Sequence, residues 1–287
     1  MEIYIATFAA LLSTLLLAVV YLADRYEREP VELIQDFFLS GLLGQLLLIL
    51  AMTTMMGDFF WSGPWLLVTL VFASLYLPFR LRCQAEVDER FDGIVYTVAL
   101  VGGATCVIHL NNLPRVIAAS PYREVIAPGA APDLRDLLII ATWPGFTAEL
   151  GQGLVLISAA VLIGAVLGTL QLRGVPPWQI TLASVAVAIT TAGLDLATQG
   201  AWPVRGVLVV AAVAVSLAIK RRSVFRDRPE PPERDVLIMG LKTALMVFGA
   251  ALLATVLLQA VVEQPGTADV PFSGHEHLQS GQSEIEQ

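Results

Sequence analysis

The sequence contains little charge for its length. Only 15% of its 287 residues are Asp, Glu, Lys or Arg, whereas about 25% is usual in soluble domains. Its 17 Lys and Arg are outnumbered by 25 Asp and Glu, which argues against the basic face of a nucleic-acid-binding protein. With 56% hydrophobic residues and a mean hydropathy of +0.72, the composition excludes an ordinary soluble enzyme and a disordered chain. It indicates a polytopic membrane protein.

Cysteines and an N-terminal basic segment are also scarce. The two cysteines, Cys83 and Cys106, are too few for a disulfide framework or a zinc cluster. The chain starts Met1-Glu2 without a basic stretch before its first apolar run. We therefore expect that run to be a retained helix and not a cleaved signal peptide.

Long apolar segments dominate what is present. A membrane-spanning helix needs about 20 mostly apolar residues, and in lipid every backbone group must be satisfied within the helix. The sequence therefore predicts an all-α transmembrane helix bundle of about eight spans within residues 1–262, with a short interfacial or re-entrant run at 137–143. The expected spans are 3–23, 32–56, 63–80, 93–113, 153–171, 178–198, 203–220 and 236–262.

The basic residues of the connections predict the orientation. Twelve of them fall on one side of the expected spans and four on the other, and cytoplasmic loops carry the excess of Lys and Arg. We therefore expect both termini to be extracytoplasmic. The first set is Arg25, Arg28, Arg80, Arg82, Arg90, Arg173, Lys220, Arg221, Arg222, Arg226, Arg228 and Arg234, and the second is Arg115, Arg123, Arg135 and Arg205.

Two polar segments flank the last expected spans. Lys220, Arg221 and Arg222 form a basic cluster that is typical of anionic-lipid binding beside a membrane helix, and equally of a signal that fixes topology. Residues 263–287 are polar and acidic, and we expect a disordered extracytoplasmic tail.

Two motifs resemble those of a known family. One follows the first span and has the pattern D-x-Y-x-x-E-P, and the other opens the fourth span as Asp-Gly-Ile-Val-Tyr. Together they resemble the bacterial PrsW family of intramembrane proteases, which is similar to the CAAX-processing proteases. The resemblance covers about residues 1–200 and implies a PrsW-like bundle in the bacterial cytoplasmic membrane. The motif residues are Asp24, Tyr26, Glu29, Pro30, Asp92, Gly93 and Tyr96.

The hydrolytic motifs of that family are degenerate in this chain. Its E-E-x-x-K pattern falls on Thr69, Leu70 and Ala73, and residues 61–79 contain no Asp, Glu, His, Lys or Arg. The second-motif glutamate falls on Ile108. The last H-x-x-x-D pair falls on Thr191 and Asp195. Our leading hypothesis is therefore a protease homologue without hydrolytic activity and without a cofactor, which binds or regulates a membrane partner such as a single-span protein.

Three ionisable residues within the expected helices support an alternative. His109, Glu149 and Asp195 would be the candidate catalytic residues of a divergent active peptidase, holding one divalent metal such as zinc. Other interpretations remain open for each of them. His109 could hydrogen-bond Asn112 or a backbone carbonyl, Glu149 could be a first-turn acid at a helix start, and Asp195 could pair with Arg205.

A third hypothesis is a transporter or channel component. Eight helices are compatible with it, but no pair of broken helices recurs in the two halves of the chain. It predicts ion or solute flux that depends on Asp195 or on Lys242.

Overall fold

The computed structural model describes residues 31–56, 65–84, 87, 89–118 and 144–221, with three further positions at 242, 245 and 249. These residues contain six helices and no strand. The helices are α2 (Val31–Met56), α3 (Trp65–Gln84), α4 (Arg90–Ala118), α6 (Pro144–Leu172), α7 (Pro177–Ala197) and α8 (Trp202–Lys220). Each is long and apolar enough to cross a membrane. The described part of the chain is therefore an all-helical bundle of the kind found in multi-pass membrane proteins.

Six of the expected spans correspond to these helices. The expected spans 3–23 and 236–262, the run at 137–143, the tail and the motif of Asp24, Tyr26, Glu29 and Pro30 lie outside the described residues, apart from Lys242, Leu245 and Gly249. The total number of spans is thus a prediction for the rest of the chain.

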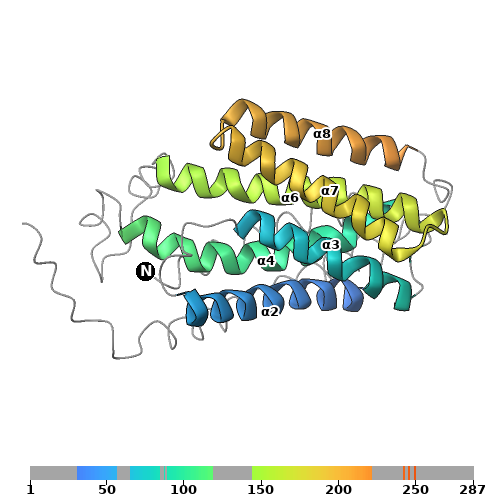
Figure 1. Ribbon diagram of the computed structural model, residues 1–287, viewed down its shortest axis with the longest axis horizontal. Helices are drawn as coiled ribbons and strands as arrows, with labels where there is room; N and C mark the ends of the chain where they lie inside the picture. Colours follow the sequence, from blue (N-terminus) through green and yellow to red (C-terminus); the bar gives the residue numbers. More distant parts are fainter. Residues whose placement is uncertain are drawn as a thin grey trace, which may run out of the picture.

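The helices differ strongly in burial. All residues of the apolar window of α4 are buried, against 28% in α7 and 17% in α8. Helix α4 packs mainly on α2 and α6, α3 packs on α7, and α7 and α8 each pack on α6 (Figure 1). Helices α4 and α6 therefore form the centre of the bundle, and α7 and α8 form an outer layer with large exposed apolar faces.

Glycines allow the central helices to approach closely. A Cβ atom added to Gly93 on α4 would overlap the backbone of Gly164 and Gly168 on α6, and one added to Gly103 would overlap the carbonyl oxygen of Phe38 on α2. Small residues of this kind let helix backbones touch in a membrane, where packing replaces the hydrophobic effect as the driving force. Gly93 of the Asp-Gly motif thus has a packing role.

Two short turns set the directions of the last three helices. Gly174 (φ 67°) lies between α6 and α7, and Gly200 (φ 71°) lies between α7 and α8. Both adopt the left-handed region that favours glycine, and Pro177 and Pro203 stand in the first turn of the helix that follows, where proline is tolerated. Helices α6, α7 and α8 therefore alternate in direction.

We name the two ends of the bundle by a residue of α4. The Arg90 end holds the start of α4 and the α6–α7 turn. The His109 end holds the last turns of α4, the start of α6 and the α7–α8 turn (Figure 1).

One helix boundary corrects a prediction. Helix α6 begins at Pro144, well before the expected residue 153, and its first turn contains no acidic residue. Glu149 therefore lies in the second turn of α6, and its interpretation as a first-turn acid is wrong. The Pro-Gly pair at 144–145 starts the helix, where proline is tolerated because the amide hydrogen that it lacks would have no partner there.

Candidate functional site

His109 and Glu149 lie together at the His109 end of the bundle. His109 comes from α4 and Glu149 from α6, and the distance from the imidazole Nδ1 to the carboxylate Oε2 is 3.8 Å. His109 is almost fully buried, whereas the Glu149 side chain is 15% exposed. The pair therefore connects the interior of the bundle with its end.

Neither imidazole nitrogen of His109 has a hydrogen-bond partner among the described residues. Because 3.8 Å is too long for a hydrogen bond, the ring and the carboxylate are neighbours that are not hydrogen-bonded to each other. On the other side, a Cβ atom added to Gly153 would lie 2.9 Å from Nε2, so the ring stands against the bare backbone of α6. A buried group with free donors and acceptors is unusual and requires an explanation.

The expected hydrogen bond between His109 and Asn112 is not formed, which corrects that interpretation. The Asn112 amide instead donates to both carboxylate oxygens of Glu149, at 3.4 and 3.3 Å, and accepts a bond of 3.1 Å from the Asn111 amide. Hydrogen bonds to a carboxylate are among the stronger ones in proteins, which favours Glu149 as the partner of the Asn112 amide. Since Asn112 and Glu149 are far apart in sequence, no local pattern could have predicted this contact.

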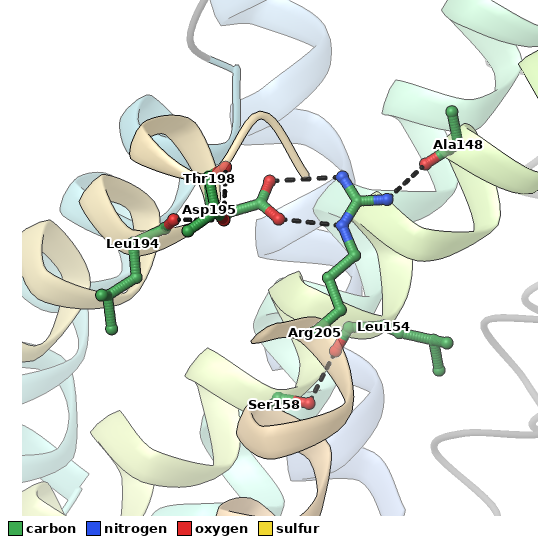
Figure 2. A network of polar contacts seen from close by, with 7 residues as sticks. All are labelled: Ala148, Leu154, Ser158, Leu194, Asp195, Thr198 and Arg205. Carbon is green, nitrogen blue, oxygen red and sulfur yellow. Dashed lines mark hydrogen bonds and ion pairs between the residues drawn. The ribbon is translucent and has the colours of Figure 1, made fainter. Parts of the chain in front are cut away.

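Asp195 forms an ion pair with Arg205, as one of the two interpretations predicted. The guanidinium Nε and Nη2 atoms donate to the two carboxylate oxygens at 2.8 and 3.3 Å, and Nη1 donates to the carbonyl oxygen of Ala148 at 3.3 Å. Figure 2 shows this guanidinium between the α7–α8 turn and the start of α6. Its two-pronged geometry joins three helices, and such bidentate pairs are the strongest of their class.

The surroundings of Arg205 explain why the guanidinium is held in place. A Cβ atom added to Gly151 would overlap Nη1, and one added to Gly200 would lie 2.5 Å from Nη2. Trp202 lies beside the guanidinium, with 5.8 Å from Cζ to the ring centroid. Arg205 is thus only 8% exposed although it carries a permanent charge.

The alternative metal site would need His109, Glu149 and Asp195 together. Over the described residues, no group of three His, Cys, Asp or Glu side chains is placed to hold a metal ion. The Asp195 carboxylate is committed to Arg205, so the three-ligand set is not assembled. What remains is a two-residue imidazole–carboxylate pair, an arrangement that can hold or transfer a proton.

The degenerate motif positions lie in the core. Thr69, Leu70, Ala73, Ile108 and Thr191 are each 97% buried or more. Two of them use their polar atoms for structure. The Thr69 hydroxyl donates to Gln45 Oε1 at 3.0 Å, and the Thr191 hydroxyl donates to the Val187 carbonyl at 2.8 Å. These positions supply packing and helix contacts, with no group that could activate water.

The Asp-Gly-Ile-Val-Tyr segment at the start of α4 has an architectural role. Asp92 accepts a hydrogen bond from the Glu89 amide at 2.6 Å, which caps the start of α4. The Tyr96 ring is fully buried and lies tilted on Phe37, with 4.9 Å between centroids. With Gly93 at the α4–α6 contact, all three motif residues hold α4 in place.

Comparison of the chain with protein-family models, with curated proteins and with solved structures finds no match.

Proposed function

We propose that this protein is a PrsW-like protein of the bacterial cytoplasmic membrane that has no hydrolytic activity and binds a membrane-protein partner through the exposed face of α7. In this proposal the side with twelve basic residues is cytoplasmic, which places the Arg90 end inside and the His109 end outside. The lipid bilayer is the second partner of the outer layer.

The main support for the proposed lack of hydrolytic activity is the packing at Thr69, Leu70 and Ala73. All three are buried in the bundle, and the polar one is bonded to Gln45. Peptide hydrolysis within a membrane requires a water-accessible site with a carboxylate or metal that activates water. Where the PrsW resemblance expects these groups, the side chains support only helix packing.

The partner surface is argued from α7, which carries small residues on its exposed side. Ala186, Thr190 and Gly193 are all exposed and follow one another at helical spacing. A Cβ atom added to Gly193 would meet nothing within 4 Å, so no helix of the described chain occupies this face. Small residues in such a row allow a second helix to approach closely in a membrane.

The first test is proteolysis. The purified full chain is incubated in vesicles with a panel of single-span membrane proteins, beside an active intramembrane protease as positive control. We expect no cleavage product. A product that disappears with His109→Ala would refute the proposal.

The second test compares the same substitution at two exposed glycines, one on α7 and one on α8. A photo-reactive residue at Ile189, which is 54% exposed on α7, should form a discrete protein adduct in cell membranes. Gly193→Leu should abolish this adduct, whereas Gly206→Leu on α8 should leave it unchanged. Since both glycines face open space, both variants should fold. Loss of the adduct in both variants, or lipid adducts alone, would contradict a partner on α7.

One observation favours a second function, a divergent peptidase. Both nitrogens of His109 lack a partner among the described residues and lie beside the Glu149 carboxylate, and a pair of this kind is a candidate for general acid–base catalysis. This function requires cleavage that both His109→Ala and Glu149→Gln abolish, while Asp195→Asn, placed in the ion pair, affects mainly stability.

A further inference from the structure

An apolar cavity of about 570 Å³ opens between α6, α7 and α8 at the Arg90 end. Its walls include Leu162 and Val166 of α6, Val187 of α7 and Val215 of α8. The cavity exists because α7 and α8 contact each other little while each packs on α6. The two helices meet at their turn and separate toward the Arg90 end (Figure 1).

Two arginines stand at one end of this cavity. Arg90 begins α4 and Arg173 follows the end of α6, and both residues line the cavity. Neither guanidinium has a hydrogen bond or ion pair with another residue that the structure describes. This differs from Arg80, which pairs with Asp36 at 2.8 Å, and from Arg205. Two positive charges without a partner among the described residues therefore line an apolar space.

The dimensions of the cavity fit one leaflet of a bilayer. At about 1.5 Å per residue, the α6 wall from Leu162 to Arg173 is about 16 Å long. Half of a hydrocarbon core of about 30 Å is about 15 Å. The arginines would then lie at headgroup level while the apolar wall lies at the depth of the acyl chain.

We propose that this cavity is a binding site for one anionic membrane phospholipid, with Arg90 and Arg173 holding the phosphate group and the α6–α7–α8 wall holding an acyl chain. Basic pockets between transmembrane helices bind such headgroups, and guanidinium groups match phosphate geometry. Lys220 and Arg221, the described part of the basic cluster in which the sequence suggested lipid binding, follow the lining residue Ile219 in the chain. The site does not depend on the proposed partner of α7 or on the absence of hydrolysis.

The test is native mass spectrometry of the full chain in detergent, titrated with phosphatidylglycerol or with phosphatidylcholine of the same acyl chains. We expect preferential retention of phosphatidylglycerol. Each of Arg90→Gln and Arg173→Gln should weaken its binding about fivefold, since a basic residue near the membrane surface contributes about this factor. Arg82→Gln, which removes an exposed arginine of α3 outside the cavity, should leave binding unchanged.

A second variant tests the wall without changing charge. Val166→Trp should fill the cavity and lower phosphatidylglycerol retention at least as much as the arginine changes. Thermal unfolding close to that of the parent chain would show that the variant is folded. Inorganic phosphate and glycerol phosphate should not displace the lipid, because they lack the acyl chain.

Three outcomes would overturn the proposal. Equal retention of the two lipids would remove the role of the anionic headgroup. An equal loss in Arg82→Gln would mean a general effect of surface charge. Displacement by millimolar inorganic phosphate, with binding unaffected by Val166→Trp, would identify a site for free phosphate in place of a lipid.

Discussion

Two polar pairs lie at the same end of the bundle and are built in opposite ways. In the α7–α8 corner, Arg205 donates two hydrogen bonds to Asp195 and a third to a backbone carbonyl. In the α4–α6 corner, His109 lies 3.8 Å from Glu149 and makes no hydrogen bond with a described residue. The first pair uses its donors to join helices, whereas in the second both imidazole nitrogens of His109 lack a partner among the described residues and Glu149 accepts hydrogen bonds from Asn112.

This difference separates structure from potential function. A charge that is buried and fully paired stabilises one arrangement of helices, and its removal leaves the partner charge exposed to the apolar interior. A buried group without partners lowers stability and persists where something else requires it. The comparison therefore gives Asp195 and Arg205 a structural role. His109 is the residue whose substitution would be most informative.

The largest expected effect comes from breaking the paired corner. Arg205→Met removes the guanidinium but keeps an unbranched side chain, and it leaves the Asp195 carboxylate without its partner. We expect a loss of about 3 kcal/mol or more in the free energy of unfolding, measured by denaturant titration in mixed micelles, because one partner of a buried ion pair is removed.

The matched control for that variant is Arg82→Met. Arg82 is exposed and has no ion pair among the described residues, so this change should alter stability by less than about 0.5 kcal/mol. A loss below about 1 kcal/mol for Arg205→Met would show that the ion pair is not structural, and Asp195 would return as a candidate ligand.

The sequence predicted the α7–α8 corner, with its Asp195–Arg205 pair, better than the α4–α6 corner. Six apolar segments were placed correctly because hydropathy and length determine where a membrane helix can exist. The Asp195–Arg205 pair could be inferred because its members flank one short turn, and a lone charge beside a membrane span needs a partner. Both inferences depend on information close together in the chain.

The α4–α6 corner depends on packing that the sequence does not encode locally. Glu149 was interpreted as a first-turn acid at a helix start, yet α6 begins at Pro144 and its first turn contains no acidic residue. The bond from Asn112 to Glu149 joins residues 37 positions apart, and the register between α4 and α6 is set by Gly93, Gly164 and Gly168. The cavity beside Arg173 likewise arises from the separation of α7 and α8, which no single segment reveals.

A pair of glycines on α6 provides the next comparison. Alanine at Gly151 would overlap the Arg205 guanidinium, whereas alanine at Gly153 would lie 2.9 Å from His109 Nε2. Both substitutions gain about 1 kcal/mol in helix propensity. Because the guanidinium is held by three bonds and overpacking costs about 1–3 kcal/mol, we expect Gly151→Ala to be destabilising by about 1 kcal/mol net.

For Gly153→Ala we expect a change close to zero, because the imidazole has no hydrogen bond that prevents a small rotation. The same micelle titration measures both variants. If Gly153→Ala is the more damaging of the two, His109 is held more firmly than its contacts indicate, and the contrast between the two corners fails.

The smallest expected effect is the most discriminating. His109→Leu replaces a buried imidazole that has two unsatisfied nitrogens with an apolar side chain of similar size. Removing a buried polar group that has no partner is nearly neutral or stabilising, so we expect the free energy of unfolding to stay the same or rise by up to about 1 kcal/mol. A loss of about 2 kcal/mol or more would mean that a bound proton, water or ligand satisfies the ring in the native protein. Combined with the loss in Arg205→Met, a neutral result would show that the ion pair stabilises this end of the bundle and that His109 does not. A loss at both sites would instead give His109 and Glu149 a role beyond packing, and the peptidase assay with Glu149→Gln would become the decisive experiment.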